Sequence, residues 1–353
     1  MTDVALRSKA FVKLGTFLRE FCEYSKKPID LVGINEHWFP EFNAKIDLSG
    51  HKNGWHTREN VLFSLENWGR QLTESNINNW LKEYDLTTIS PKQVAIIMAG
   101  NIPLVGFHDF LSTLITGNNI LIKASTNDNV LLPFLAKYLV HIEPSFKKAI
   151  VFVEGQLQNY DCVIATGSNN TARYFEHYFG GKPNIIRRNR NSVAILTGKE
   201  SAEQLHALGE DIFRYFGLGC RSVSKLFVPV GYNFDAFFKA IYPYKTIIEG
   251  VKYSNNYDYN KAVYLMSEFK ILDNGFLLLK ENKSYASPIG TVFYEPYDSM
   301  ENLMNLLESD KEKLQCIVGN GILKTEIPFG QTQTPSLNDY ADGVDTVEFL
   351  LRT

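Results

Sequence analysis

Residues 94–125 read VAIIMAGNIPLVGFHDFLSTLITGNNILIKAS, and this stretch decides the class of fold. Its first five residues form an apolar, strand-like run, and residues 99–103 (AGNIP) predict a turn. Apolar residues at helical spacing follow from 104 to 115, Gly117-Asn118 predict the helix end, and 120–122 predict a second strand. A strand, a helix and a strand in this order are typical of a parallel sheet, because its neighbouring strands need a long crossover.

The same alternation continues along the chain. Helices are expected over 129–141 and 168–178, and strands over 149–153, 161–165 and 192–197. After a helix over 202–215, further strands are expected at 226–229, 276–279, 291–294 and 316–318 and helices at 234–241, 259–268 and 300–307. We therefore expect an α/β protein with two parallel-sheet domains.

Both ends of the chain differ from this middle part. Residues 1–85 carry apolar stripes at helical spacing and are expected to be mostly helical, with a loop-rich connection over 33–55. Residues 345–351 (DTVEFLL) predict a C-terminal strand. We expect four parts: a helical N-terminal region (1–85), a first α/β domain (86–198), a second α/β domain (199–327) and a C-terminal return segment (328–353).

Composition excludes several classes of protein. A net charge of −3 gives no electrostatic case for nucleic acid, and no run of about 18 apolar residues predicts a membrane span. No apolar segment of the signal-peptide kind follows the N-terminus. The four cysteines are far apart and form no Cys-x-x-Cys pair, which argues against structural zinc and disulfides and for a reducing cytoplasm. The seven histidines are scattered, so we expect no metal site.

Residues 216–222 (FGLGCRS) contain the candidate nucleophile, Cys220. Two glycines precede it between a helical pattern and an apolar run, and glycines let the backbone turn tightly and approach a ligand closely. Cys220 is therefore placed to act as a thiolate nucleophile. The alternative is a small, buried and inert cysteine.

Four short motifs occur in one order: residues 99–103 (AGNIP), 117–125 (GNNILIKAS), 165–168 (ATGS) and 217–221 (GLGCR). Together they resemble the aldehyde dehydrogenase superfamily over residues 90–335. The closing stretches 328–335 (PFGQTQTP) and 340–350 (YADGVDTVEFL) are similar to the bacterial fatty-acyl-CoA or acyl-protein thioester reductases.

The resemblance implies a role for each candidate residue. Cys220 would take the acyl group from a thioester, and the Asn101 side-chain amide would join the Cys220 backbone N–H in stabilising the oxyanion. Lys123 would hydrogen-bond the adenosine ribose, and Ser125 and Thr126 would also belong to the cofactor-binding residues. Gly167 and Ser168 would face cofactor phosphate at a helix N-terminus, and Phe329 would line the nicotinamide end. Read without the resemblance, these are a turn Asn, a solvated Lys, a helix cap and a core Phe.

The chain departs from the superfamily pattern before the strand at 192–197. Where hydrolytic members carry a Glu-Leu-Gly-Gly-Lys stretch, this chain has Arg187-Arg188-Asn189-Arg190-Asn191. Arg187 is nearest the missing Glu, and either binds a cofactor or carrier phosphate or belongs to a solvated basic patch. The Glu of the superfamily's Glu-x-Phe-Gly-Pro motif is also absent, since residues 287–291 read SPIGT.

The resemblance thus implies NAD(P)H-dependent reduction of an acyl-CoA or acyl-protein thioester to an aldehyde. The expected cofactor is NADPH, with NADH possible, because Thr126 stands where NAD-selective members have a Glu. The expected assembly is a homodimer or homotetramer that uses the C-terminal strand. Oxidation of a free aldehyde to an acid and a non-catalytic acyl-binding or partner-binding role are the alternatives.

Overall fold

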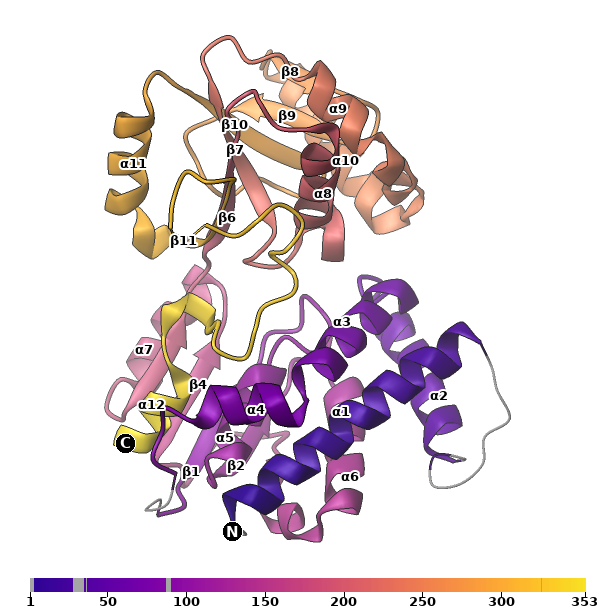
Figure 1. Ribbon diagram of the computed structural model, residues 1–353, viewed down its shortest axis with the longest axis vertical. Coiled ribbons are helices and arrows are strands. Elements are labelled where there is room, and N and C mark those ends of the chain that lie inside the picture. The colour runs from indigo at the N-terminus through magenta and orange to yellow at the C-terminus, as the bar shows by residue number, and fades with distance from the viewer. Residues whose placement is uncertain (1–2, 28–34, 36, 87–89, 325) are drawn as a thin grey trace. The chain divides into compact units, whose positions relative to one another are not determined.

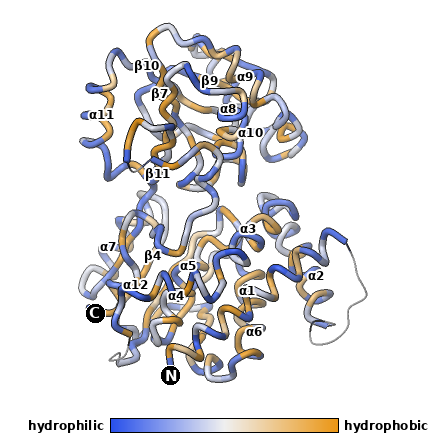
Figure 2. Tube along the Cα trace, viewed as in Figure 1, coloured by the Kyte–Doolittle hydropathy of each residue, from blue (hydrophilic) through white to orange (hydrophobic). Residues whose placement is uncertain are grey.

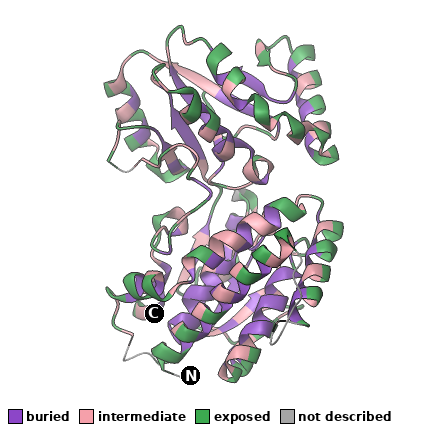
Figure 3. Ribbon diagram, turned by 45° about the vertical axis from the view of Figure 1, so that its right-hand side comes forward, coloured by how far each residue is buried: buried purple, intermediate pink, exposed green. Residues whose placement is uncertain are grey.

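The computed structural model describes residues 3–27, 35, 37–86, 90–324 and 326–353. The chain forms two compact units, Met1–Arg188 with Ser336–Thr353 and Asn189–Pro335. Each unit is built around its own sheet (Figure 1). Apolar residues run along the central strands of both sheets in Figure 2, and Figure 3 shows these strands buried together with the helix faces that pack on them. The expected α/β class with parallel sheets is confirmed.

The first unit contains a five-stranded parallel sheet in the order β3-β2-β1-β4-β5. Its strands are β1 (Gln93–Ile97), β2 (Asn119–Lys123), β3 (Ile150–Phe152), β4 (Cys162–Thr166) and β5 (Asn184–Arg187). The chain proceeds outward from β1 through β2 to β3, and then from β4 to β5 on the other side. The strand order therefore reverses between β1 and β4, and ligands of open parallel sheets bind at the carboxyl ends beside such a reversal.

Helices cover this first sheet. Those between the strands are α5 (Phe107–Ile115), α6 (Leu131–Ile142) and α7 (Asn169–Phe179), and those before the sheet are α1 (Val4–Lys26), α2 (Trp38–Lys52), α3 (Arg58–Gln71) and α4 (Glu74–Leu81). The N-terminal helices share one apolar core with the sheet. For example, the rings of Phe17 on α1 and Tyr138 on α6 stack with centroids 3.9 Å apart. The expected helical N-terminal region is confirmed.

The second unit contains a six-stranded sheet in the order β11-β6-β7-β10-β9-β8. Its strands are β6 (Asn191–Ile195), β7 (Val223–Pro229), β8 (Ile271–Asp273), β9 (Leu278–Glu281), β10 (Thr291–Tyr297) and β11 (Leu314–Val318). Only the edge strand β8 is antiparallel to its neighbour among the paired strands. The helices are α8 (Ala202–Phe213), α9 (Asp235–Ile241), α10 (Val251–Met266) and α11 (Met300–Ser309).

The prediction of a C-terminal strand is wrong. Residues 346–352 form the helix α12 (Thr346–Arg352), which packs on α5 in the first unit. Asp345 caps this helix, because its side chain accepts a hydrogen bond from the Glu348 backbone N–H at 2.8 Å. Val347 and Leu350 are buried, and their spacing of three residues suits one face of a helix as well as an apolar run suits a strand.

The prediction of a loop-rich connection over residues 33–55 is wrong for residues 38–52, which form α2. Residues 33, 34 and 36 lie outside the described residues. The buried apolar side chains of α2 are Trp38, Phe39, Phe42 and Ile46, at the spacing of a helix face. The aromatic residues of this segment are therefore packed in the apolar core of the first unit.

Candidate active site

Cys220 lies in the loop between α8 and β7, in the second unit. It is exposed, whereas Cys22, Cys162 and Cys316, the other cysteines of the chain, are buried. Burial raises the pKa of the Cys22 thiol to about 12 and that of the Cys162 thiol to about 11. A thiol nucleophile must be both accessible and ionisable, and Cys220 is the accessible one.

The backbone before Cys220 has an unusual conformation. Tyr215, Phe216 and Gly217 are three consecutive residues in the left-handed region, with φ values of 54°, 58° and 75°. For residues with bulky side chains this conformation costs on the order of 1–3 kcal/mol each, and such residues gather at functional sites. Gly217 continues the turn without that cost. The strained turn ends α8 and leads the chain into the cysteine loop.

The main chain at Cys220 is held by a buried hydroxyl. Ser192 at the start of β6 donates from Oγ to the Cys220 carbonyl oxygen at 2.9 Å, and its exposed fraction is 0%. Cys220 also lies within a turn, since the Ser222 N–H donates to the Gly219 carbonyl at 3.0 Å. These bonds fix the backbone of the nucleophile at the amino end of β7.

Phe329, the other candidate of the second unit, is half-buried and packs against the unit's apolar core. Gly330, which follows it, has a φ of 81°, and a Cβ there would lie 3.0 Å from the Cβ of Ala207 on α8. The chain therefore passes closely over α8 at this point. Packing is the role that these contacts give Phe329, and a contact with nicotinamide stays a prediction.

The remaining candidates belong to the first unit and lie at one edge of its sheet. Ile97, the last residue of β1, is in register with Lys123 at the end of β2 and with Ala165 near the end of β4. The loop with Asn101, the turn with Ser125 and Thr126, and the Gly167-Ser168 pair follow these three strands. The parallel register thus brings them to the carboxyl edge, beside the reversal of strand order.

Asn101 is exposed in a loop that is anchored on three sides. Asn53 donates from Nδ2 to the Gly100 carbonyl at 3.1 Å, and Ser64 donates from Oγ to the Pro103 carbonyl at 3.2 Å. The Leu104 N–H, in a residue with a φ of 58°, donates to Asp128 Oδ2 at 3.2 Å. A loop held in this way can present a side-chain amide in a fixed direction.

Among the three side chains that hold the Asn101 loop, Asp128 is the ionisable one. It is 9% exposed, and burial raises its pKa to about 6, against the lowering effect of the Leu104 hydrogen bond. Gly100 allows this close approach, since a Cβ there would lie 2.6 Å from Ser125 Oγ and 3.1 Å from Asp128 Cβ. The Asn101 loop and the turn at 125–128 are therefore packed directly against each other.

The expected cofactor contacts lie at the end of β2 and on that turn. Lys123 is half-buried, and its Nζ donates to the Gly155 carbonyl at 3.0 Å, which leaves further donors on the ammonium group. Ser125 is half-buried and accepts from the Asn127 N–H at 3.2 Å, and Thr126 is exposed.

Gly167 and Ser168 directly precede α7. Ser168 caps the helix by accepting from the Thr171 N–H at 3.2 Å, as expected of a helix cap. A Cβ at Gly167 would lie 3.0 Å from both Phe175 and Thr171, so the glycine is required for close packing. The N-terminus of α7 lies at the carboxyl edge of the sheet, where backbone N–H groups favour anions.

Both sequence interpretations of Arg187 are wrong. Its side chain is 7% exposed and forms a bidentate ion pair with Asp109 of α5. Arg187 therefore neither belongs to a solvated patch nor faces a phosphate site. Arg188 pairs with Glu176 at the surface, and Arg190 donates to the Leu314 carbonyl at 3.2 Å. The tract of arginines is therefore divided among three separate structural roles.

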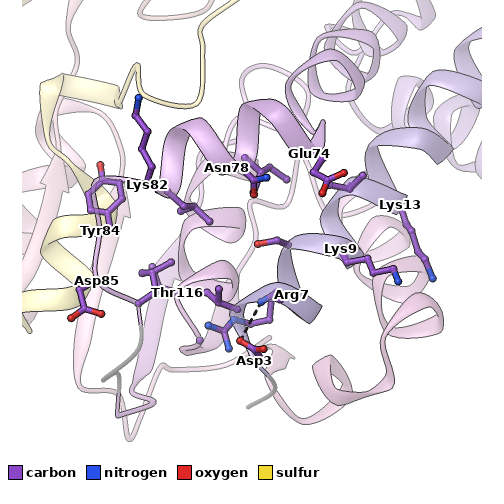
Figure 4. Close-up of a pocket in the computed structure, with 18 of the residues that line it drawn as sticks. Asp3, Arg7, Lys9, Lys13, Glu74, Asn78, Lys82, Tyr84, Asp85 and Thr116 are labelled. Carbon is purple, nitrogen blue, oxygen red and sulfur yellow. Dashed lines mark hydrogen bonds between the residues drawn. The ribbon is translucent and has the colours of Figure 1, made fainter.

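A pocket of about 1090 Å³ lies in the first unit, away from these candidates. It is bounded by α1, α4 and residues that precede β1 and β2, among them Pro91, Thr116 and Gly117 (Figure 4). These residues are at the amino edge of the sheet, opposite Asn101 and Lys123. None of the predicted site residues lines this pocket.

Sequence reasoning missed the supports of the site. The sequence motifs include neither Ser192 nor Asp211, a buried carboxylate on α8, and Asp128 lies just beyond the motif that ends at Ser125. One signal was available: Asp211 stands three residues after Leu208 on the apolar stripe of α8, where an acidic residue must have partners.

No helix among the described residues is long and apolar enough to span a membrane. No three side chains of His, Cys, Asp or Glu in the described part of the chain are grouped as metal ligands.

Comparison with known proteins gives a family for the chain. The family model described as acyl-CoA reductase (LuxC) matches residues 72–325. A long-chain acyl-protein thioester reductase from Aliivibrio fischeri is 27% identical over 233 residues, which cover 59% of this chain and 47% of that protein. The chain thus spans about half the length of this curated relative.

Solved structures show the fold. Aldehyde dehydrogenase 21 from Physcomitrella patens, crystallised with succinate, has a TM-score of 0.68 at 11% sequence identity. The match covers 99% of this chain and 84% of that chain. An aldehyde dehydrogenase from Bacillus cereus in complex with NAD⁺ has a TM-score of 0.60 at 14% sequence identity, and the match covers 90% of this chain and 72% of that chain. The fold is that of the aldehyde dehydrogenases, and on the match of residues 72–325 the chain belongs to the acyl-CoA reductase (LuxC) family.

Proposed function

We propose that this protein reduces an acyl thioester to an aldehyde through an acyl-Cys220 intermediate. The observation that carries the proposal is the exposed Cys220 behind a strained left-handed turn, in a chain of the acyl-CoA reductase family. The long-chain acyl-protein thioester reductase of Aliivibrio fischeri supports a fatty acyl thioester as the substrate, carried by coenzyme A or by a protein.

A nicotinamide dinucleotide fits the first unit. The carboxyl edge beside the β1/β4 reversal presents the N-terminus of α7, the Lys123 ammonium group and two glycines, Gly100 and Gly167, whose added Cβ atoms would collide with their neighbours. The dehydrogenase of Bacillus cereus, which shares the fold, was solved with NAD⁺. When bound, NADPH or NADH supplies the hydride.

The residues of the chain perform the remaining steps. The Cys220 thiolate attacks the thioester carbonyl carbon, and the negative charge on the oxygen is stabilised by the Asn101 amide and the Cys220 backbone N–H. The carbon–sulfur bond to the carrier then breaks, and the carrier leaves as a thiol after taking up a proton. Hydride addition to the acyl-cysteine carbonyl carbon gives a second tetrahedral oxyanion, which collapses to release the aldehyde and the Cys220 thiolate.

The test measures NADPH oxidation with acyl-CoA substrates of increasing chain length, together with labelling of Cys220 by a thiol reagent. We expect turnover with at least one acyl-CoA, loss of turnover in Cys220→Ala with cofactor binding retained, and protection of Cys220 from the reagent by acyl-CoA alone. Cys316→Ala, a buried cysteine of the same unit, is the matched control and should retain activity.

Two outcomes contradict the proposal. An active Cys220→Ala protein would exclude the acyl-Cys220 intermediate. A wild-type protein that binds acyl-CoA but oxidises no cofactor with any chain length would favour the non-catalytic acyl-binding alternative.

A further inference from the structure

We propose that Asp211 of α8 is a positioning residue that holds the Cys220 loop through residues 330–333. The proposal rests on the proposed function only in calling Cys220 the nucleophile. All the groups involved belong to the second unit.

Asp211 is fully buried, with an exposed fraction of 0%. Its carboxylate accepts three hydrogen bonds from one short segment: from the Gly330 N–H at 2.6 Å, from the Thr332 N–H at 2.9 Å and from Thr332 Oγ1 at 2.8 Å. Hydrogen bonds to a charged acceptor are about twice as strong as neutral ones. Asp211 therefore fixes residues 330–332 against α8, although they are more than a hundred positions away in the sequence.

The same segment continues to the nucleophile. Arg221, next to Cys220, donates from Nε to the Thr332 carbonyl, and Gln333 donates from Nε2 to Ser222 Oγ at 3.3 Å. Thr332 thus binds Asp211 with its N–H and hydroxyl and Arg221 with its carbonyl. The two residues that follow Cys220 are both connected to the segment that Asp211 fixes.

The conformation of the loop explains why such support is required. Tyr215 and Phe216, with their left-handed backbones, precede Cys220, and strained residues persist only where their surroundings over-determine them. Ser192 holds the Cys220 carbonyl from β6. Asp211 supplies the support on the α8 side.

Burying the charged carboxylate of Asp211 costs free energy. Burial raises the pKa of Asp211 to about 6, and its bonds to Gly330 and Thr332 offset part of that effect. The charged group beside it on the helix is Glu210, which is paired with Arg214. A buried acid that served only to fill space would be replaced without loss by an apolar residue, whereas here three donors converge on it.

The experiment compares Asp211→Asn, Thr332→Val and Thr332→Ser with the control Glu210→Gln, an adjacent acid of α8 that is bonded to Arg214. We measure kcat, KM, cofactor affinity, thermal unfolding and the rate of Cys220 alkylation by iodoacetamide, with the labelled site identified by mass spectrometry. Asp211→Asn should lower kcat by roughly 10- to 100-fold, as expected for a misplaced reacting group, and change the alkylation rate. Cofactor affinity should be retained.

Thr332→Val should show a smaller effect in the same direction, because it removes one of the three donors, and Thr332→Ser should restore wild-type values. Glu210→Gln should leave kcat and alkylation unchanged. A folded Asp211→Asn protein with wild-type kcat and wild-type alkylation would overturn the proposal. If Asp211→Asn does not fold, the Thr332 pair decides: equal alkylation rates and kcat values in Thr332→Val and wild type would overturn it.

The alkylation rate separates this proposal from the function itself. If Cys220→Ala kept its activity, the acyl-cysteine mechanism would fail, but alkylation of Cys220 in the Asp211 and Thr332 variants would still show whether Asp211 positions the loop.

Discussion

Arg187, the last residue of β5, forms a buried, bidentate ion pair with Asp109 in the first turn of α5. Arg187 also donates to Thr346 Oγ1 at 3.1 Å, at the start of α12. One guanidinium group therefore connects a central helix, an edge strand and the C-terminal helix of the first unit. Its planar set of five donors suits this task, which the single ammonium of a lysine would not meet.

Arg187→Met should destabilise the first unit strongly. Removal of one partner leaves the Asp109 carboxylate buried without its countercharge, which costs about 3–5 kcal/mol. The exposed pair of Arg188 with Glu176 is the matched control, and Arg188→Met should cost at most about 1 kcal/mol. Urea unfolding of both variants measures the difference, and equal midpoints would contradict the structural role of Arg187.

This pair illustrates what could not be predicted from the sequence. The alternation of strands and helices is visible because apolar periodicity is a local property, and it led to the correct fold class. The partner of Arg187 lies 78 residues away, and no local pattern connects the two. The resemblance to dehydrogenases placed the arginine near a missing glutamate, whereas its true surroundings are set by tertiary packing.

The secondary structure of short apolar segments is also hard to predict from the sequence. Residues 345–351 fit a strand by composition, but the Asp345 cap and the buried pair Val347 and Leu350 make them a helix. The candidate site was predicted at its exposed points, Cys220 and Asn101, because glycine-rich turns are visible in a sequence. Its supports, Ser192, Asp128 and Asp211, became visible only once distant segments were in contact.

Asp128→Asn should gain stability relative to wild type as the pH rises toward neutrality. The folded-state pKa of Asp128, about 6, is above the ordinary value of 3.8, so the folded protein retains a proton that the unfolded chain releases. Wild-type stability from this group is therefore lost as pH rises from about 4 to about 6 and is level above that, a loss of about 2–3 kcal/mol. Asparagine does not titrate, so it lacks this pH-dependent loss, and its amide oxygen can still accept from the Leu104 N–H.

The measurement is the free energy of unfolding of wild type and Asp128→Asn between pH 4 and pH 8. The difference between them should grow in favour of Asp128→Asn up to about pH 6 and then remain constant. Asp128 Oδ1 has no hydrogen-bond partner among the described residues, so the amide nitrogen that replaces it costs about 1–3 kcal/mol, an effect that does not vary with pH. A difference that is independent of pH would show that Asp128 titrates normally. Asp128→Leu, which removes the acceptor for Leu104, is the contrasting variant and should reduce activity.

Asn101→Ala should lower the rate of the chemical step by roughly 10²–10³-fold, the usual effect of one lost oxyanion donor. The loop backbone should stay in place, because Asn53, Ser64 and Asp128 hold it through main-chain atoms of other residues. Single-turnover kinetics with acyl-CoA measure the step, and the thermal unfolding midpoint is the control. An unchanged rate constant would reduce Asn101 to a turn residue.

We predict that the protein prefers NADPH to NADH. A carboxylate at position 126 would bind the ribose 2′-hydroxyl and repel a 2′-phosphate, and Thr126 does neither. Asp128, the nearest acid in the sequence, is buried and accepts from Leu104. Thr126 is exposed, so Thr126→Glu can be accommodated and should shift the ratio of kcat/KM values toward NADH by roughly tenfold or more. Thr126→Gln, of equal size without the charge, is the control, and a wild-type preference for NADH would contradict the prediction.

The protein should convert little aldehyde to free acid. A hydrolytic dehydrogenase activates water against the acyl-cysteine with a carboxylate general base. The stretch that corresponds to that carboxylate contains Arg187, Arg188 and Arg190, whose guanidinium groups cannot accept a proton at neutral pH. Each is engaged elsewhere, with Asp109, Glu176 and the Leu314 carbonyl. The acyl-cysteine should therefore persist until hydride or a thiol reaches it.

The measurement incubates the protein with a medium-chain aldehyde and NADP⁺, with and without coenzyme A, and quantifies free acid and acyl-CoA. With coenzyme A, the reverse of the proposed reaction should give acyl-CoA, because the thiol can attack the acyl-cysteine where water is not activated. Without coenzyme A, at most one equivalent of NADPH per active site should form, since the acyl group stays on Cys220. Rapid acid formation without coenzyme A would show that a general base acts on this intermediate from another part of the chain, and aldehyde oxidation would then be the better description of the reaction.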